Sequence, residues 1–260
     1  MKIFKILVFI NKNTKNKLKI PLYIIIGGVY KFMKIVLPDM CFSWKIFNGM
    51  KIIVYPQAPS TTAFIYADYY DRKEIDILRS ICDKNSVFID IGANVGVYCA
   101  MLMDKVKKII AFEAHPVTFE KLKMLFLLNN YKDYELFNIA VSNKSDRIFF
   151  TDKGYLSHEN SISHRSEGIK INSDCLDNLI TKLNKDDNYI IKIDVEGFEQ
   201  EILKGGKEFL KQSAVRCILL EKSENKLRQE EVCKILSSYG YSVKNIKNSN
   251  NFFAQRGLKG

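Results

Sequence analysis

Residues 87–96 constrain the fold of this chain more than any other stretch, because they read VFIDIGANVG. The opening residues are apolar and β-branched, which is the pattern of a buried strand. The chain then passes through an acid and two glycines into residues 97–103, VYCAMLM, which are typical of a helix. A strand, a glycine turn and a helix form the entry unit of doubly wound α/β folds that bind nucleotides. The new helix favours a carboxylate or phosphate at the turn, since its free N–H groups and dipole point there.

Two ligands compete for this turn, a dinucleotide and S-adenosylmethionine. A dinucleotide fingerprint places a glycine where this chain has Asn94, at a point where the pyrophosphate needs bare backbone. We expect Asp90 at the strand tip facing the ligand, where it would repel a pyrophosphate and suit the ammonium group of a methionine. Glu113 ends the next apolar run, residues 108–112, where an acid accepts ribose hydroxyls in either cofactor class. The pattern favours a methyl-donor site over two acids that only cap the following helices.

The remaining turn residues have separate expected roles. Gly92 should let the backbone approach the ligand, and Gly96 should let the helix pack tightly on the strand. Asn94 is one of the few non-glycine residues that tolerate a left-handed conformation. Residues 134–141 are predicted to form a third strand, whose tip would face the adenine with backbone and small side chains.

Composition indicates one globular domain with an extension. The 260 residues are 47% hydrophobic and 27% charged, which supplies ample apolar material for a core. The six cysteines are scattered without paired spacing, and most fall in predicted strands and helices. We therefore expect reduced core cysteines in a cytoplasmic protein. The sequence contains no metal-ligand cluster of cysteine and histidine.

The positive charge is concentrated near the N-terminus. The chain carries +11, of which residues 1–51, with ten lysines and one aspartate, contribute +9. The rest is nearly neutral, which argues against a nucleic-acid groove there. The first apolar run is too short for a signal peptide, and residues 20–38, interrupted by two lysines, are too short for a confident membrane span. Residues 1–40 could contact a membrane surface, but a helix packed on the domain is the favoured interpretation.

Further elements follow on both sides of the central stretch. Residues 42–55 are predicted to form a β-hairpin around Asn48-Gly49, since both residues accept the positive φ of a tight turn. Residues 152–167 are polar and long for a loop, which favours a substrate lid or a mobile loop over a metal site. We expect an extension over residues 1–60 and a catalytic domain over residues 61–260.

The C-terminal half completes the expected sheet. Residues 189–193 and 215–221 read as buried strands that end in acids. Residues 241–246 and 252–255 flank an Asn/Ser turn and predict a closing hairpin. The sequence therefore predicts an α/β fold with a doubly wound, seven-stranded, Rossmann-like methyltransferase sheet that ends in an antiparallel pair.

Three ordered motifs carry a family resemblance over roughly residues 60–225. They are FIDIGANVG at residues 88–96, FEAHP at 112–116 and KIDVEGFEQEILKG at 192–205, with CLDNL at 175–179 between the last two. In these motifs the chain resembles the FkbM family of S-adenosylmethionine-dependent methyltransferases. Ala114 stands where a proline is commoner. The resemblance implies methyl transfer to an acceptor hydroxyl, often on a sugar of a bacterial surface polysaccharide or glycolipid, or on a secondary metabolite.

The expected site combines the motifs with the sheet geometry. The cofactor-binding residues are expected to be Asp90, Gly92, Ala93, Asn94, Gly96, Glu113, Asn138, Ala140 and Asp194. Across the crevice, Asp194 and Glu196 are candidate bases for the acceptor hydroxyl, and Lys192 would orient either acid. For Asp194, a purely cofactor-binding role is as well supported as catalysis. A divalent metal held by Asp194, Glu196 and Glu221 is a less favoured alternative.

Two other functions are alternatives to glycan O-methylation. An amino-group methylase of nucleic acid would be expected to show Asn/Asp-Pro-Pro-aromatic, where this chain has Asp194-Val195-Glu196-Gly197. A non-catalytic, membrane-associated binding module is the weakest alternative, because the cofactor residues are intact. We therefore expect a small-molecule or glycan acceptor and no nucleic-acid partner.

Overall fold

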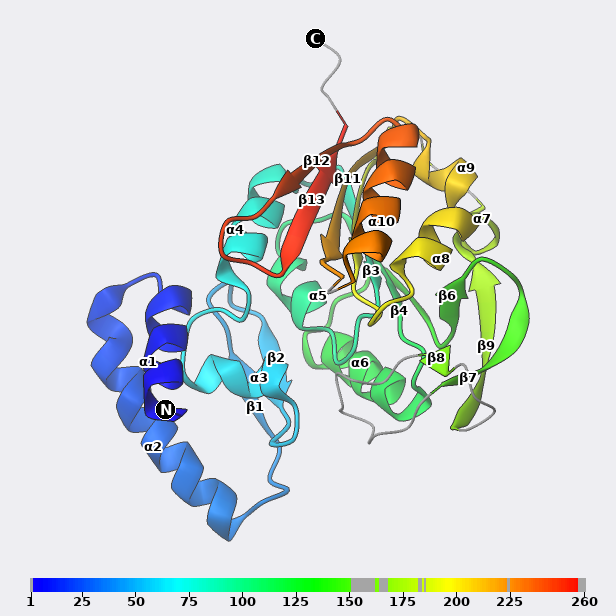
Figure 1. Cartoon of the computed structure of the whole chain (residues 1–260). Helices are drawn as coiled ribbons and strands as arrows, with labels where there is room; N and C mark the ends of the chain where they lie inside the picture. Colours follow the sequence, from blue (N-terminus) through cyan, green and yellow to red (C-terminus); the bar gives the residue numbers. More distant parts are fainter. Residues whose placement is uncertain are drawn as a thin grey trace.

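The computed structural model describes residues 2–150, 162–163, 168–181, 184, 186–223 and 225–256. The expected lid over residues 152–167 lies outside the described residues except for Ile162 and Ser163. In Figure 1 the α/β body occupies one side, and the N-terminal helices project from the other.

A seven-stranded sheet forms the centre of the body, as the sequence predicts. Its strands, in spatial order, are β12 (Ser242–Asn245), β13 (Asn251–Gln255), β11 (Val215–Glu221), β10 (Asn188–Ile193), β3 (Ser86–Ile91), β4 (Lys108–Phe112) and β5 (Tyr134–Phe137). The strands from β11 to β5 are parallel, and β13 runs antiparallel to both of its neighbours. The strand order reverses direction between β3 and β10, which is where such sheets bind ligands.

Helices cover both faces of this sheet. One face packs against α4 (Arg72–Ile81), α5 (Val97–Leu102) and α6 (Pro116–Leu128). The other packs against α7 (Leu176–Leu179), α8 (Glu199–Gly205), α9 (Lys207–Leu210) and α10 (Lys226–Ser238). Alternation along the strands explains the two layers: Phe88 belongs to the first core, whereas Ile89 and Ile91 belong to the second.

The predicted third strand is wrong in its length. Strand β5 ends at Phe137, and the following residues belong to a second sheet of four strands. That sheet consists of β6 (Ala140–Ser142), β9 (Ile169–Cys175), β7 (Asp146–Phe150) and β8 (Ile162–Ser163). The break falls at Asn138, whose side-chain amide donates to the backbone oxygens of Glu113 and Ala114 at 2.9 and 3.0 Å. Apolar residues stand on both sides of Asn138, so hydrophobicity alone did not show that the strand ends there.

The N-terminal residues form a helical hairpin and a β-hairpin. Their elements are α1 (Lys2–Asn13), η1 (Lys17–Lys19), α2 (Ile20–Val36), β1 (Phe42–Lys45), β2 (Lys51–Val54), α3 (Pro59–Thr62) and η2 (Ala63–Ile65). The β-hairpin turn differs from the prediction, since only Gly49 has a positive φ, +86°. Asn48 instead donates its side-chain amide to Ala100 O and Asp104 Oδ1, both at 2.9 Å. The turn therefore ties the hairpin to α5.

Candidate active site

The turn between β3 and α5 closes tightly against β10. Gly92 has φ +80°, and a Cβ atom there would lie 2.0 Å from the backbone oxygen of Asp194. The Gly92 N–H donates to Phe112 O at 3.0 Å, and the Asp194 N–H donates to Ile91 O at 3.1 Å. Three strand tips thus meet at one glycine, and no other residue type fits without moving backbone.

The second glycine of the motif serves a neighbouring helix. Gly96 has φ +83° at the start of α5, and a Cβ atom there would lie 2.4 Å from Leu125 Cδ2 and 2.7 Å from Leu122 Cδ1. Both leucines belong to α6, so Gly96 allows helix-on-helix packing rather than the helix-on-strand packing expected from the sequence. Asn94 adopts the predicted left-handed conformation, with φ +52°.

Glu113 holds the turn through its carboxylate. Its Oε2 accepts the Asn94 N–H and its Oε1 accepts the His115 N–H, each at 2.8 Å. Burial raises the pKa of Glu113 to about 7, although these two backbone donors oppose the shift. Each carboxylate oxygen keeps a further lone pair, so Glu113 can still accept ribose hydroxyls beside the turn.

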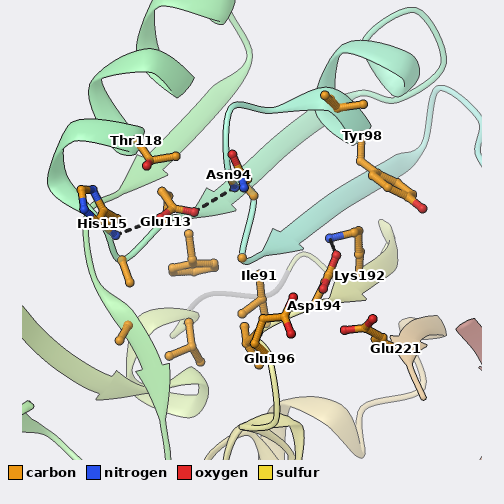
Figure 2. A pocket seen from close by; sticks show the side chains of 18 of the residues that line it. Ile91, Asn94, Tyr98, Glu113, His115, Thr118, Lys192, Asp194, Glu196 and Glu221 are labelled. Carbon is orange, nitrogen blue, oxygen red and sulfur yellow. Dashed lines mark hydrogen bonds and ion pairs between the residues drawn. The ribbon is translucent and has the colours of Figure 1, made fainter. Parts of the chain in front are cut away.

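A cavity of about 300 Å³ opens above the turn. Eight of the expected site residues line it, namely Gly92, Ala93, Asn94, Glu113, Ala140, Lys192, Asp194 and Glu196. Asp90, Gly96 and Asn138 are not among the lining residues. Figure 2 shows Asn94, Glu113 and His115 gathered at one end of this cavity and Lys192, Asp194, Glu196 and Glu221 at the other.

Asp90 lies beneath the cavity, which differs from the position expected for it. It is 1% exposed, and its Oδ1 lies 3.6 Å from Lys192 Nζ because the two residues are paired on adjacent parallel strands. Lys192 Nζ also lies 2.9 Å from Asp194 Oδ2. Burial alone would lower the pKa of Lys192, but Asp194 and Asp90 together raise it above its usual value. Lys192 is therefore a fixed cation between the two acids, and Asp90 holds it in place.

Three acids gather at the tips of β10 and β11. Carboxylate oxygens of Asp194, Glu196 and Glu221 all lie within 4.8 Å of one another. Burial, together with Asp194 and Glu196, raises the pKa of Glu221 to about 8. Glu196 has φ +53° and is followed by Gly197 at +97°, a sharp turn that brings its side chain back to the cavity. This cluster can attract a cation or take a proton.

Sequence reasoning missed a supporting layer around Lys192. The Lys192 ammonium lies 4.9 Å from the centre of the Tyr98 ring, and Tyr98 donates its hydroxyl to Asp71 Oδ2 at 2.9 Å. Burial and the nearby Glu74 raise the pKa of Asp71 to about 6. Tyr70, beside Asp71, lines the cavity. Both residues lie in the segment before α4, which carries no motif that would have revealed them.

Comparison with known proteins decides the family. A family model described as the methyltransferase FkbM domain matches residues 90–243, more than half of the chain. The chain belongs to the FkbM methyltransferase family. It is an enzyme that transfers methyl groups from S-adenosylmethionine. No curated protein matches the sequence.

The chain is also similar to several solved structures, at low identity. A putative methyltransferase from Streptococcus mutans in complex with SAH is 14% identical, with a TM-score of 0.44 over 70% of this chain and 93% of that chain. A putative rRNA-methylase from Clostridium thermocellum is 9% identical, with a TM-score of 0.46 over 72% of this chain and 96% of that chain. An rRNA methylase from Streptococcus thermophilus is 15% identical, with a TM-score of 0.43 over 72% and 96%. Likenesses at this level say nothing about the acceptor of this FkbM enzyme.

The cavity fits S-adenosylmethionine at both ends. Phe112, Ile139 and Val141 line the cavity and would supply apolar walls for the adenine, and Glu113 would supply acceptors for the ribose. The other end is acidic, which suits a ligand that carries an ammonium and a sulfonium. The donor brings an activated methyl group, so the protein has to align it with the acceptor and exclude water.

Proposed function

We propose that this FkbM enzyme methylates a hydroxyl group of a sugar, on a surface polysaccharide or glycolipid. The observation that carries the proposal is the cluster of Asp194, Glu196 and Glu221 beside the donor site. A hydroxyl is a weak nucleophile while protonated, and a nearby carboxylate accelerates such reactions about 10²–10⁴-fold by taking the proton. Carboxylates also accept hydrogen bonds from neighbouring sugar hydroxyls.

The transfer is a single displacement. A lone pair of the acceptor oxygen forms the bond to the methyl carbon while the carbon–sulfur bond breaks. The electron pair of that bond stays on sulfur and gives S-adenosylhomocysteine, and the hydroxyl proton passes to a carboxylate. Glu196 is the proposed base or acceptor anchor, since it is more exposed than the other two acids. Asp194 is the proposed contact to the donor, and Lys192 fixes its orientation at 2.9 Å.

The charge distribution supports a sugar or small-molecule acceptor over nucleic acid. The residues after position 51 carry about as many acids as bases, whereas a nucleic-acid enzyme needs a basic surface around its site. At this site the acids dominate, and they would repel phosphates. A secondary metabolite with a free hydroxyl is the remaining alternative, because it needs the same chemistry.

We also propose that the enzyme works at the cytoplasmic face of a membrane, in peripheral contact through residues 1–40. Among the described residues, no helix is long and apolar enough to cross a membrane. Large apolar side chains on α2 are nevertheless exposed. Residues 1–60 are the proposed extension that makes this contact, and residues 61–260 the proposed catalytic domain.

Amide substitutions test the catalytic assignment. Glu196→Gln keeps the size and hydrogen-bonding capacity of the side chain but removes its basicity. We expect the rate constant at saturating donor to fall at least about 10²-fold, with affinity for S-adenosylmethionine nearly unchanged. Asp194→Asn should instead weaken donor binding. Glu208→Gln, on the exposed surface of α9, is the matched control. Full activity in both site variants would leave alignment as the only mechanism.

Mass spectrometry of surface glycans, with and without the active enzyme, identifies the acceptor. A methyl group that disappears from a sugar in its absence supports the proposal. Unchanged glycans together with an altered secondary metabolite would contradict it. Loss of activity with a chelator, restored by a divalent ion, would show that a metal held by the three acids activates the hydroxyl.

A further inference from the structure

Helix α2 turns an apolar face away from the protein. Its inner side consists of Tyr23, Gly27 and Tyr30, which are buried. The outer α2 face consists of Leu22, Ile25, Val29, Phe32 and Val36, whose exposed fractions range from 53% to 67%. These five residues recur at helical spacing and form one continuous strip without a charge. Proteins rarely leave such a strip in water unless it binds something.

The inner side fixes the orientation of this face. Tyr23 donates its hydroxyl to Asp68 Oδ1 at 2.6 Å. At Gly27 a Cβ atom would lie 2.3 Å from the Tyr66 ring, so the helix packs closely on the segment after η2. The Tyr30 ring meets the Tyr66 ring edge-on, with ring centres 6.4 Å apart. These contacts hold α2 against the segment between η2 and α4, and Figure 1 shows α2 at the edge of the molecule, away from the central sheet.

Charge decides which partner fits the outer α2 face. Residues 1–51 contain ten lysines and one acid, and lysines 12, 15, 17 and 19 lie at the turn that joins α1 to α2. A second copy of this chain would bring +9 against +9, and Asp39, the single acid of residues 1–51, cannot offset ten lysines. An anionic lipid surface supplies both an apolar layer and negative head groups, each lysine near it adding to the attraction.

We propose that the outer α2 face lies in the boundary between head groups and acyl chains of an anionic bilayer. The helix has 17 residues and is therefore about 25 Å long, and it lies parallel to the surface because its inner side is packed on the protein. The exposed Lys12 and Lys15 beside the α1–α2 turn reach the head groups, whereas Lys19 pairs with Asp68 and Lys17 donates to Asn11 O. Leu18, which is 88% exposed at that turn, extends the apolar contact.

This docking also orients the active site. Tyr66, against which α2 packs, lies in the segment that runs from α3 to α4, and Pro59, Ser60 and Tyr70 of that segment line the cavity. A bilayer under α2 therefore lies at a fixed position relative to the wall of the cavity. On the basis of the proposed methyl transfer, the acceptor class that this arrangement serves is a sugar carried on a lipid.

Vesicle co-sedimentation of the full chain tests the docking. We expect binding to vesicles of phosphatidylcholine with phosphatidylserine, weaker binding to phosphatidylcholine alone, and weakening with salt. Phe32→Ser should reduce the partition coefficient by about tenfold or more. Leu227→Ser on α10 is the matched control, since Leu227 and Phe32 are 73% and 67% exposed. Equal vesicle binding by the two variants would overturn the proposal. The proposal would also be overturned if the unmodified protein did not bind vesicles but formed a dimer that Phe32→Ser dissociates.

A second readout separates this inference from the proposed function. Phe32→Ser should leave the melting temperature and the affinity for S-adenosylhomocysteine unchanged, since its side chain touches neither the core nor the cavity. Transfer to a water-soluble acceptor should also stay unchanged, while transfer to the same sugar on a lipid in vesicles should fall. If no sugar is methylated but vesicles are bound, the proposed function fails and the docking stands. If both acceptors respond equally to Phe32→Ser, the orienting role is wrong.

Discussion

Strand β3 and helix α2 are both apolar segments, yet the fold treats them differently. All six residues of β3 are buried, whereas only three of the 17 residues of α2 are. β3 lies between two parallel neighbours, with helices on both faces of the sheet, so every side chain is enclosed. α2 has a partner on one side only. An apolar sequence therefore does not distinguish a core element from an exposed binding surface. The elements that pack around the segment make that distinction.

The same contrast sets the effect of a substitution. At the turn after β3, backbone and side chains from several elements are in close contact, so an added atom has to displace them. On the outer α2 face an added or removed atom meets solvent. Substitutions at the turn after β3 should change stability and cofactor binding. Substitutions on the outer α2 face should change only binding to the membrane surface.

The largest effect is expected at Gly92. Gly92→Ala would push a methyl group into the backbone of Asp194, and we expect a loss of unfolding free energy beyond about 4 kcal/mol and no cofactor binding. Gly49→Ala is the matched control, because Gly49 has a similar φ, +86°, with nothing within 4 Å. It should lose about 1–2 kcal/mol. Denaturant unfolding of both variants measures the difference. Similar losses of unfolding free energy would show that the backbone at the strand tips can shift to accommodate a methyl group.

The next effect concerns the buried lysine. Lys192→Met leaves Asp90 and Asp194 without their cation, which should cost about 3–5 kcal/mol of unfolding free energy. Lys204→Met on α8 is exposed and should change stability by less than about 0.5 kcal/mol. Chemical denaturation of the two variants at neutral pH provides the comparison. A stable Lys192→Met protein would mean that the acids pick up protons without penalty.

The acid cluster should give the protein a pH dependence. The pKa of Glu221 is about 8 when folded, against an ordinary value of 4.5, so ionisation is unfavourable in the folded state. Its contribution to stability is full below pH 4.5 and is lost as the pH rises through 8. Glu221→Gln should flatten the fall in unfolding free energy over this range, as measured by denaturation at several pH values. If the unfolding free energy of Glu221→Gln fell with pH as steeply as that of Glu208→Gln, the cluster would be more hydrated than its geometry indicates.

The smallest effects are expected on α2, where only one of two adjacent glycines contacts the rest of the protein. Gly27→Ala meets the Tyr66 ring and should destabilise by about 1–3 kcal/mol. Gly28→Ala has nothing within 4 Å and should stabilise the helix by up to about 1 kcal/mol. Thermal melting of both variants checks the pair. Equal shifts would mean that the inner side of α2 is not packed on the body.

The two regions also differ in how much the sequence revealed. The sheet, its order of motifs and the donor turn were predictable, because Gly92, Asn94 and Glu113 each satisfy a local rule of backbone or charge. The predicted position of Asp90 was wrong, because its place beneath the cavity depends on Lys192, its partner on the neighbouring parallel strand. The wall contributed by Tyr70 and the second sheet after Asn138 depend on long-range packing, which leaves no periodic signal. For α2 the sequence offered a packed helix or a surface helix, and the structure packs one side and exposes the other.

Calorimetry with S-adenosylhomocysteine and NAD tests the central claim, that the cavity above Gly92 is a methyl-donor site. The account predicts that S-adenosylhomocysteine binds and that NAD does not compete with it. It also predicts that Glu113→Ala weakens this binding by about 1.5–3 kcal/mol, the usual loss for a hydrogen bond to a charged group. Tighter binding of NAD than of S-adenosylhomocysteine, or unchanged affinity in Glu113→Ala, would contradict it.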